Sequence, residues 1–555
     1  MIQPAYTREI EDLIEGDIDV TENTLEAHSK DTSIFKVRPT IVVFPKNEDD
    51  IVKLVRFVNQ KNESRGKNDN KLTLTARSAG TCMSGGSLTE SIQLDMTRYL
   101  NHILEAGEGF ATSEPGVFYR DFEAETLKHG YIMPSYPASR ELCAIGGIVN
   151  NNSGGEKTLT YGKTEKYIRS VRLVLADGSV ETFKKITLSE LTEKIKEETL
   201  SGQIHKNLFS LISDNFDDIK NAKPQVSKNS AGYYLWNVYN KDDNTFDIPK
   251  LIAGSQGTFG MMTQVTFDLI KPKQHSRMLV IFLKDLSKLP EVVGEVLAFK
   301  PESFESYDDH TFKIAMKFFP DIAKRMKGNL FTLGIQFIPE FLMVLSGGVP
   351  KLVLMAEFAG DTEEEVDTQM TKAYDRVVSL GYTARAIHSP QEAKKYWTFR
   401  RESFNLLRSK MRGLRTAPFI DDFVVRPEFL PEFLPKLEIV LSKYNLIYTV
   451  AGHIGDGNFH IIPLMDLHED KSIKVIESLS KEVYDLIREY KGSITGEHND
   501  GLVRTPFLYE MYSEKILDLF KDTKAIFDKD NIFNPGKKVG GDLAYSFEHI
   551  DRTHA

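Results

Sequence analysis

The segment AGHIGDGNFH places two histidines, His453 and His460, on either side of a Gly-Asp-Gly-Asn sequence. Residues of these types favour tight turns, so the flanking segments and their imidazoles are expected to converge. A second motif, Gly-Glu-His, supplies Glu497 and His498. Two imidazoles and one carboxylate form a common divalent-metal ligand set that leaves coordination positions open for a substrate. A hydrogen-bonded cluster without metal stays open as the alternative.

Three glycine-rich segments occur earlier in the chain. The first, ARSAGTCMSGGS at residues 76–87, has consecutive backbone N–H groups that would form a nest for a phosphate. An ordinary turn fits the same residues. The second spans residues 134–164, and its two glycine pairs and three consecutive asparagines offer donors along an extended path, as a large heteroaromatic cofactor requires. The third is AGSQGTFG, residues 253–260, between two apolar strands.

The elements around these segments predict one domain over residues 38–270. A strand is expected at 41–44, and Asn47 is a candidate helix cap. The residues that follow have the apolar spacing of an amphipathic helix at Ile51, Leu54, Val55 and Val58. Strands, helices and glycine-rich loops then alternate to about residue 270. Residues 186–250, which are rich in Lys, Glu, Asp and Asn, predict helices and a surface insertion.

The pattern changes at about residue 271. The segments RMLVIFL and KLVLMAEFAG predict strands separated by long helices, such as residues 362–380. This pattern is typical of an α+β domain with an antiparallel sheet, assigned to residues 271–495. Residues 1–37 are expected to form a short helical lead-in. Residues 496–555 are expected to form a C-terminal segment that ends in NIFNPGKKVGG and a short tail.

The composition bounds the class of protein. Hydrophobic residues make up 41% and charged residues 27% of the 555 residues, which is typical of soluble globular proteins. The net charge of -10 and the absence of a Lys/Arg run argue against a general nucleic-acid binder. With two cysteines, Cys82 and Cys143, this chain has no disulfide framework and no four-thiolate zinc or iron–sulfur site.

Neither the N-terminus nor the most apolar stretch predicts export or a membrane span. The N-terminus is acidic and lacks the apolar core of a signal peptide. Residues 330–354 are interrupted by prolines and charges, whereas a span needs about 20 apolar residues, so core strands are expected there. We expect a cytoplasmic protein, with attachment to a membrane surface left open.

The order and spacing of the glycine-rich segments resemble the FAD-binding domain of the vanillyl-alcohol oxidase and p-cresol methylhydroxylase (PCMH) superfamily. In that family the first loop holds the FAD pyrophosphate, and the second segment runs along the ribityl chain and isoalloxazine ring. The third segment resembles the family's Gly-Ser-Glu-Gly-Thr-Leu-Gly stretch, with Gln256 and Phe259 replacing Glu and Leu. The Asn-Pro-Gly-Lys sequence beginning at Asn534 is similar to the family's closing motif. The resemblance covers about residues 36–540.

This resemblance implies an α+β protein with a two-subdomain FAD-binding domain of the PCMH type. It also implies a substrate (cap) domain with an antiparallel sheet, and a C-terminal helical segment that returns to the flavin. The FAD is expected to be noncovalent, because the first loop lacks His and similar noncovalent relatives carry Ser or Gly where Cys82 stands. The implied cofactor-binding residues are Arg77, Ser78, Ala79, Gly80, Thr81, Cys82, Ser84, Gly85, Gly86, Pro137, Ala138, Ser139, Cys143, Gly146, Gly147, Asn150, Asn151, Ser153, Gly154, Gly155, Tyr161, Gly162, Gly257, Gly260, Val265 and Asn534.

The histidine motifs resemble the C-terminal domain of the FAD-linked oxidases that include D-lactate dehydrogenase, the glycolate oxidase flavin subunit and D-2-hydroxyglutarate dehydrogenase. The resemblance implies that His453, His460 and Glu497 bind zinc or manganese. It makes His498 the base that removes the hydroxyl proton, and Asn458 a substrate contact.

The segment YWTFRRES is similar to the family's Trp-x-x-Arg sequence, which assigns the substrate carboxylate to Arg400. A guanidinium binds a carboxylate through two parallel hydrogen bonds. The alternative is that Arg400 and the neighbouring Arg401 lie on a solvated helix face and bind no substrate. The 2-hydroxyglutarate enzymes carry a Lys just before Tyr-Asp, and the comparable PFIDDFVV has none, which favours a smaller acid such as lactate or glycolate. Asn499 replaces the glycine of the family's Gly-Glu-His-Gly.

Together these features predict FAD-dependent oxidation of a small D-2-hydroxy acid, by hydride transfer to the flavin with metal- and His-assisted deprotonation. The alternatives are a D-2-hydroxyglutarate or glycolate dehydrogenase, and a flavin-bearing electron-transfer subunit of a multi-subunit oxidase. An alkylglycerone-phosphate-synthase-like enzyme is disfavoured, because the chain lacks that group's run of histidines. The electron acceptor is left open among a quinone, a cytochrome, a flavoprotein and a separate iron–sulfur subunit.

Overall fold

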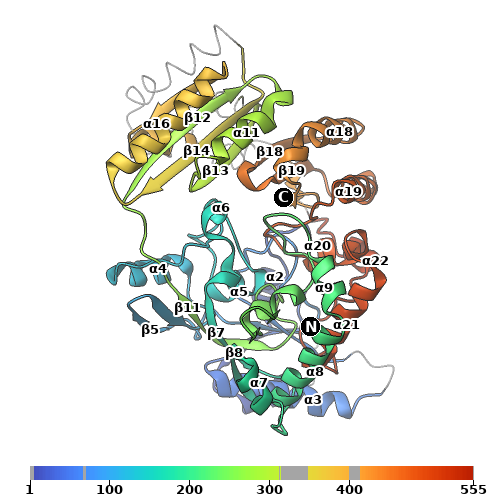
Figure 1. Cartoon of the computed structure of the whole chain (residues 1–555). Coiled ribbons are helices and arrows are strands. Elements are labelled where there is room, and N and C mark those ends of the chain that lie inside the picture. Colours follow the sequence, from blue (N-terminus) through green and yellow to red (C-terminus); the bar gives the residue numbers. More distant parts are fainter. Residues whose placement is uncertain are drawn as a thin grey trace.

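The molecule has two lobes (Figure 1). The computed structural model describes residues 6–66, 71–309, 311, 313, 348–398, 400 and 413–553. Two features predicted from the sequence, most of the apolar stretch 330–354 and the side chain of Arg401, lie outside the described residues. The lower lobe in Figure 1 contains the N-terminal half of the chain and its C-terminal helices, and the upper lobe contains the yellow-green to orange part.

A four-stranded sheet in the lower lobe has the order β1-β2-β4-β3. Its strands are β1 (Asp17–Asp19), β2 (Ile41–Phe44), β3 (Leu74–Arg77) and β4 (Ile92–Asp95). The helix α3 (Glu48–Glu63) begins after Asn47, whose side chain accepts a hydrogen bond from the Asp50 N–H. Its residues Ile51, Leu54, Val55 and Val58 are fully buried. The predicted strand, cap and amphipathic helix are therefore confirmed.

The predicted helical lead-in contains two helices and also a short strand. Between α1 (Thr7–Leu13) and α2 (Glu22–His28), the strand β1 pairs antiparallel with β2. This pairing satisfies edge N–H and C=O groups that β2 would otherwise expose. After α2, the Thr32 N–H and hydroxyl both donate to the Cys82 carbonyl, at 3.0 and 2.8 Å. The lead-in therefore contacts the first glycine-rich loop.

A second, seven-stranded sheet completes the lower lobe, and each neighbouring pair of its strands is antiparallel. In spatial order the strands are β5 (Ile103–Gly107), β6 (Phe110–Ser113), β11 (Met261–Asp268), β7 (Ile168–Val174), β8 (Val180–Thr187), β10 (Thr245–Asp247) and β9 (Tyr239–Asn240). The polar region 186–250 supplies helices α7 (Leu188–Lys194), α8 (Leu200–Asp214) and α9 (Phe216–Ala222), as predicted. Helices α4 (Tyr119–Lys128), α5 (Ile145–Asn151) and α6 (Thr158–Tyr161) lie in the connection between β6 and β7.

The upper lobe is built on an eight-stranded antiparallel sheet, which confirms the predicted α+β domain. Its strands are β12 (His275–Leu283), β13 (Ser303–Asp308), β14 (Leu352–Gly360), β15 (Thr383–Ile387), β16 (Arg415–Thr416), β17 (Phe423–Val424), β18 (Ile447–His453) and β19 (Asn458–Met465). Its long helices are α11 (Leu289–Leu297), α16 (Glu363–Ser379), α18 (Leu430–Ser442) and α19 (Asp470–Glu489).

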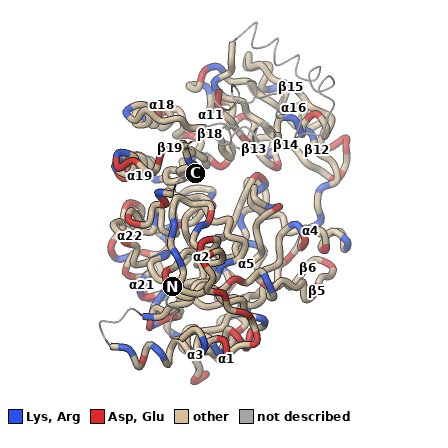
Figure 2. Tube along the Cα trace, turned by 180° about the vertical axis from the view of Figure 1, so that it is seen from behind, with Lys and Arg blue, Asp and Glu red and all other residues tan. Residues whose placement is uncertain are grey.

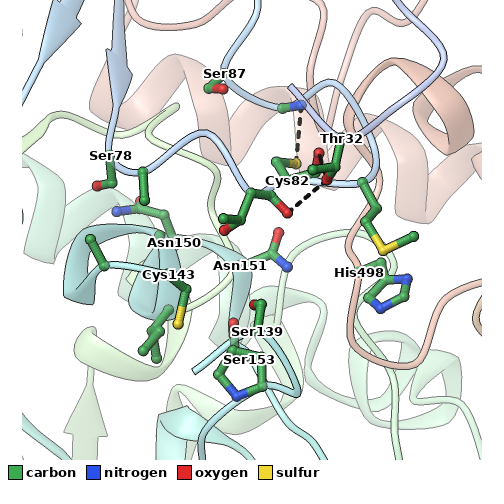
Figure 3. A pocket seen from close by; sticks show the side chains of 18 of the residues that line it. Thr32, Ser78, Cys82, Ser87, Ser139, Cys143, Asn150, Asn151, Ser153 and His498 are labelled. Carbon is green, nitrogen blue, oxygen red and sulfur yellow. Dashed lines mark hydrogen bonds between the residues drawn. The ribbon is translucent and has the colours of Figure 1, made fainter. Parts of the chain in front are cut away.

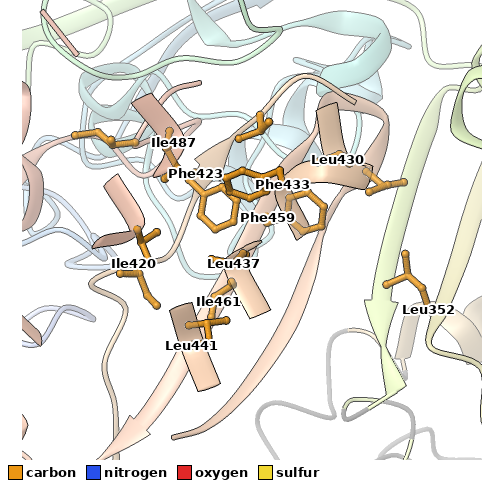
Figure 4. Packing of buried hydrophobic residues seen from close by; sticks show 14 of the residues in the cluster. Leu352, Ile420, Phe423, Leu430, Phe433, Leu437, Leu441, Phe459, Ile461 and Ile487 are labelled. Carbon is orange, nitrogen blue, oxygen red and sulfur yellow. The ribbon is translucent and has the colours of Figure 1, made fainter. Parts of the chain in front are cut away.

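These four helices share one apolar core with the sheet (Figure 4). Along α18, the buried residues Leu430, Phe433, Leu437 and Leu441 recur at intervals of three and four, the spacing of one helix face. The ring of Phe433 lies 5.4 Å from that of Phe423, which stacks on Phe459 at 5.8 Å. This core fixes β17 against β19, the strand that carries His460.

The C-terminal part of the chain returns to the lower lobe. Helices α20 (Gly501–Arg504), α21 (Glu514–Phe527) and α22 (Leu543–Glu548) follow the Gly-Glu-His motif. The Asn534 N–H donates to the Leu74 carbonyl of β3, and an isolated bridge joins Ile550 to Phe35. Residues more than 400 positions apart therefore enclose the first glycine-rich loop.

Charges of both signs are interspersed along the chain (Figure 2). Within the described residues, none of the helices combines the length and the apolar composition that crossing a bilayer demands.

The two lobes meet at a small polar cluster around Glu302. The Tyr161 hydroxyl of the lower lobe donates to Glu302 at 2.8 Å, and Lys157 forms an ion pair with the same carboxylate at 3.1 Å. Glu357, which belongs to β14, lies beside Glu302. Burial, with the charge of Glu302 added, raises the pKa of Glu357 to about 7.

A pH-dependent loss of stability follows from Glu357. Its pKa in the folded protein lies above its ordinary value of 4.5, so the folded state is favoured while the group is protonated. Stability is therefore expected to fall as the pH rises from about 4.5 through 7. Glu357→Gln should raise the stability at pH 8 by about 1–2 kcal/mol and leave it unchanged at pH 4.5. Thermal unfolding at both pH values, with exposed Glu198→Gln as control, measures this. Equal effects at both pH values would contradict it.

Candidate active site

A cavity of about 440 Å³ is lined by residues from both lobes. Its floor is the first glycine-rich loop, helix α5 and the third glycine-rich segment, and its other wall carries the side chains of the histidine motifs. Figure 3 shows Ser78 and Asn150 on one side of this pocket and His498 on the other. The cavity therefore brings together the two groups of residues that sequence motifs singled out.

Most of the residues expected to bind the cofactor line this cavity. They are Ser78, Ala79, Gly80, Thr81, Cys82, Gly86, Pro137, Ala138, Ser139, Cys143, Gly146, Gly147, Asn150, Asn151, Ser153, Gly154, Gly257 and Gly260. Gly146, the second residue of α5, shows why a glycine is needed there: an added Cβ would lie 2.6 Å from the Ser78 hydroxyl and 2.9 Å from the Pro115 carbonyl. The first loop and α5 can approach this closely only without that side chain.

The other expected cofactor residues lie off the cavity wall: Arg77, Ser84, Gly85, Gly155, Tyr161, Gly162, Val265 and Asn534. Several of them form hydrogen bonds behind the wall and support it. Arg77 donates to the Lys30 carbonyl, and Asn534 donates to the carbonyls of Gly86 and Gln256. Tyr161 instead forms part of the contact between the two lobes. Wall residues outside the three glycine-rich segments include Thr32, Met96, Met262 and Ile462. Met83, Leu142 and Gln256 lie within those segments but were not among the residues expected to bind the cofactor.

Three imidazole nitrogens converge on one carboxylate oxygen. The Nε2 atoms of His453, His460 and His498 lie 3.2, 3.4 and 3.9 Å from Glu497 Oε1. Two ligands bound about 2.0–2.1 Å from one tetrahedral ion are separated by roughly 3.3 Å. The first two distances therefore have the spacing of a shared metal.

Buried carboxylates orient these imidazoles through their other nitrogens. His453 Nδ1 lies 2.6 Å from Glu305, and His460 Nδ1 lies 3.1 Å from Asp421 Oδ1. Asp421 Oδ2 is also 2.6 Å from His498 Nδ1. When each Nδ1 carries the proton, each Nε2 presents a lone pair, which is the arrangement that metal ligands and general bases require.

The charges around His460 favour its cationic form in the metal-free protein. Burial by itself lowers the pKa of His460, but the Asp421 and Glu497 carboxylates raise it to about 10. Burial also raises the pKa of Glu497, yet Lys228 and His453 hold it well below the usual range. A bound divalent ion would replace this proton between the same ligands.

Asp422 is close enough to join a second ligand set with His460, Glu497 and His498. Both carboxylate oxygens of Asp422 already accept hydrogen bonds, however. They accept hydrogen bonds from the backbone N–H groups of Glu497 and His498, from the Thr495 hydroxyl and from the Asn458 amide. Asp422 therefore fixes the loop of the Gly-Glu-His motif, and the set with His453 is the better ligand set.

Asn458 does not occupy the expected substrate position. It is fully buried and absent from the cavity wall, and its amide donates to Asp422 Oδ1 and to the Phe423 carbonyl. Its carbonyl oxygen lies 3.5 Å from the Lys228 ammonium. The side chain thus joins β19 to the segment of Asp422 and to Lys228.

Lys228 is a residue that the motifs did not indicate. Its fully buried ammonium lies 3.2 Å from Glu497 Oε2 and 3.4 Å from Asp456 Oδ2. It comes from the lower lobe, from the polar region predicted to be a surface insertion. The following run AGYYLW, which is apolar and aromatic, was the available signal that this part of the region enters the core.

Arg400 reaches the cavity wall from the upper lobe. It pairs with Glu305 at 2.5 Å, and its buried Nε has no hydrogen-bond partner among the described residues. A buried unsatisfied donor is costly, so this nitrogen is a candidate contact for an anionic ligand in the cavity.

Known proteins resemble the chain along most of its length. Residues 39–184 match the family model described as an FAD binding domain, and residues 272–538 match that of the FAD linked oxidases, C-terminal domain. D-2-hydroxyglutarate dehydrogenase of Escherichia coli is 26% identical over 526 residues, covering 92% of this chain and 49% of that protein. The chain thus spans about half the length of that relative.

Two other relatives match over about nine tenths of their own length. The glycolate oxidase subunit GlcD of Bacillus subtilis is 24% identical, covering 92% of this chain and 91% of that protein. D-lactate dehydrogenase of Anaerostipes hadrus is 24% identical, covering 90% of each. Among solved structures, p-cresol methylhydroxylase with substrate bound superposes with a TM-score of 0.66 at 15% identity, covering 96% of this chain and 95% of that one. The predicted PCMH-type fold is confirmed.

Removing the charge of Lys228 is expected to destabilise the metal-free protein. Lys228→Met keeps the length of the side chain but leaves Glu497 and Asp456 buried without this cation, at a cost of about 3–5 kcal/mol. Thermal unfolding of chelator-treated protein should show a Tm lower by about 3–4 °C. Lys206→Met, on the exposed face of α8, is the matched control. An unchanged Tm for the Lys228 variant would show that the pair is not needed.

Proposed function

We propose that the chain oxidises a small D-2-hydroxy acid of the D-lactate type to the 2-oxo acid, because residues 39–184 match an FAD binding domain and residues 272–538 match the C-terminal domain of the FAD linked oxidases. Its relatives include proteins named for D-lactate, glycolate and D-2-hydroxyglutarate. One observation carries the proposal: Arg400 and His498 line the same cavity as the flavin-binding loops. A carboxylate anchor and a base thus face the place where the flavin would accept a hydride.

Arg400 would bind the substrate carboxylate. Glu305 holds one edge of its guanidinium, which leaves the buried Nε as a donor toward the ligand. Fixing the carboxylate also fixes the neighbouring carbon relative to the floor of the cavity, and such positioning lowers the entropic part of the barrier.

His498 would take the hydroxyl proton. Asp421 holds its Nδ1 at 2.6 Å, so Nε2 is the atom that accepts. Asp421 is fully buried and faces both His460 and His498, and it can stabilise the imidazolium that forms. The bound FAD supplies the two-electron acceptor for the hydride of the substrate carbon.

A zinc or manganese ion would fit between His453, His460 and Glu497, with Lys228 holding the second oxygen of Glu497. The ion would polarise the substrate hydroxyl and lower its pKa. The two carboxylates that hold the Nδ1 atoms, Glu305 and Asp421, support this assignment, because metal-binding histidines usually donate their other N–H to such a partner.

The wall of the cavity favours a monocarboxylate. Among the described residues, Arg400 is the single Lys or Arg side chain that lines it. Met83, Leu142 and Ile462 add apolar surface. The second carboxylate of 2-hydroxyglutarate would therefore lack a cationic partner there, whereas the methyl group of lactate has apolar neighbours.

Replacing the base tests the mechanism. His498→Ala should slow anaerobic flavin reduction by D-lactate about 10²–10⁴-fold, because the hydroxyl proton loses its acceptor. FAD content, read from the flavin absorbance, should stay unchanged. His102→Ala, an exposed histidine paired with Glu114, is the control and should reduce at the wild-type rate. Reduction of the His498 variant at that same rate would exclude His498 as the base.

A substrate panel tests the specificity. Stopped-flow bleaching of the flavin should give a kcat/KM for D-lactate at least about tenfold above that for D-2-hydroxyglutarate, because the unpaired second carboxylate costs roughly 1–3 kcal/mol. L-lactate is the stereochemical control. A preference for D-2-hydroxyglutarate would overturn the monocarboxylate assignment. Failure of every 2-hydroxy acid to bleach the flavin would favour an electron-transfer subunit.

A further inference from the structure

Glu305 is a charged residue in the interior of the upper sheet. It lies in the middle of β13, a central strand whose six residues are all buried, and its side chain is fully buried. Side chains alternate between the faces of a strand, so Glu305 shares a face with Tyr307 and not with Phe304, which packs in the core beneath the helices. A carboxylate at such a position requires charged or hydrogen-bonding partners.

Its two oxygens have separate partners with different roles. Oε1 lies 2.6 Å from His453 Nδ1, and Oε2 lies 2.5 Å from an Arg400 guanidinium nitrogen. A fully buried acid with a guanidinium on one oxygen and an imidazole on the other has the charged and polar partners that a carboxylate requires. One side chain thus touches both the expected metal ligand and the expected anchor of the substrate.

We propose that Glu305 is a positioning residue that holds His453 toward the metal and Arg400 toward the substrate carboxylate at the same time. This inference rests on the proposed function. The inference goes beyond the proposed function because it makes metal binding and substrate binding depend on the same carboxylate. His453 and Arg400 are over 50 positions apart in sequence, and Glu305 on β13 contacts both.

The amide of glutamine cannot replace this carboxylate. Oε1 faces His453 Nδ1, which donates in the tautomer that leaves Nε2 free for a metal, and Oε2 forms an ion pair with the Arg400 guanidinium. Glu305→Gln retains one acceptor oxygen and gains an NH₂ group, which must face the other donor. At least one of the two contacts is therefore lost in a side chain of nearly the same shape.

The test measures binding without turnover, in FAD-loaded protein. Mn²⁺ affinity is determined by competition with a chelator. The affinity for propionate, which carries the carboxylate but no hydroxyl to chelate a metal, is determined from the perturbation of the flavin absorbance in metal-free protein. Glu305→Gln should weaken at least one of these affinities by 10–100-fold, the usual cost of losing a residue that orients a metal ligand.

Glu302→Gln is the matched control. Glu302 is also a buried carboxylate between a Lys and a hydroxyl donor, only three positions away, but it has no contact with the cavity. It should keep both affinities within twofold of the wild type. Should Glu305→Gln fail to fold, Glu305→Asp retains the charge but is one methylene too short to reach both partners, and the same tenfold loss is expected.

Mn²⁺ and propionate affinities within twofold of the wild type in the Glu305 variant would overturn the inference. Its failure is distinguishable from failure of the proposed function. If no 2-hydroxy acid bleaches the wild-type flavin while Glu305→Gln still loses Mn²⁺ or propionate affinity, the proposed function falls and the positioning role stands.

Discussion

The arrangement of the active site depends on Asp422, a buried carboxylate outside the expected set of metal ligands. It accepts the backbone N–H groups of Glu497 and His498 and the Thr495 hydroxyl, which fixes the conformation of the Gly-Glu-His loop. It also accepts the amide of Asn458, at the start of β19. Because these bonds reach both histidine motifs, one charge sets the distance between them. A buried carboxylate is stable only with such partners, so the requirement to satisfy its charge also orders the loop.

The same requirement explains why the site joins both lobes. Glu497 lies between the imidazoles of the upper lobe and the Lys228 ammonium of the lower lobe. The pairing of buried charges therefore provides a specific contact between the lobes, in addition to the smaller cluster around Glu302. The floor of the cavity and the wall that carries His498 are held in register by charges, and the apolar cores of the upper lobe (Figure 4) and the lower lobe make both rigid.

Local patterns were sufficient for the elements and for the walls of the site. Apolar spacing predicted α3, the long stretch between apolar strands predicted α16, and glycine-rich composition located the loops that line the cavity. Glu305, Asp421 and Lys228 were missed, because a single charged residue in a strand, in an Asp-Asp pair or in a Lys-rich region has no motif. Each acts on a partner 39 to 269 positions away, so only the tertiary fold reveals it. Asn458 was predicted to contact the substrate, but its amide donates to Asp422, a buried carboxylate that requires hydrogen-bond donors.

The departure at Asn499 from the family's glycine can be explained in the same terms. Its backbone has φ of +68°, a conformation that glycine adopts freely and that asparagine tolerates better than most residues. The asparagine side chain then makes contacts that a glycine lacks. It donates to the carbonyls of Asn151, at the end of α5, and Gly254, and it accepts from Lys538. The residue next to the proposed base is thereby tied to the floor of the flavin cavity. The substitution keeps the turn and adds a link between the base and the cofactor-binding segments.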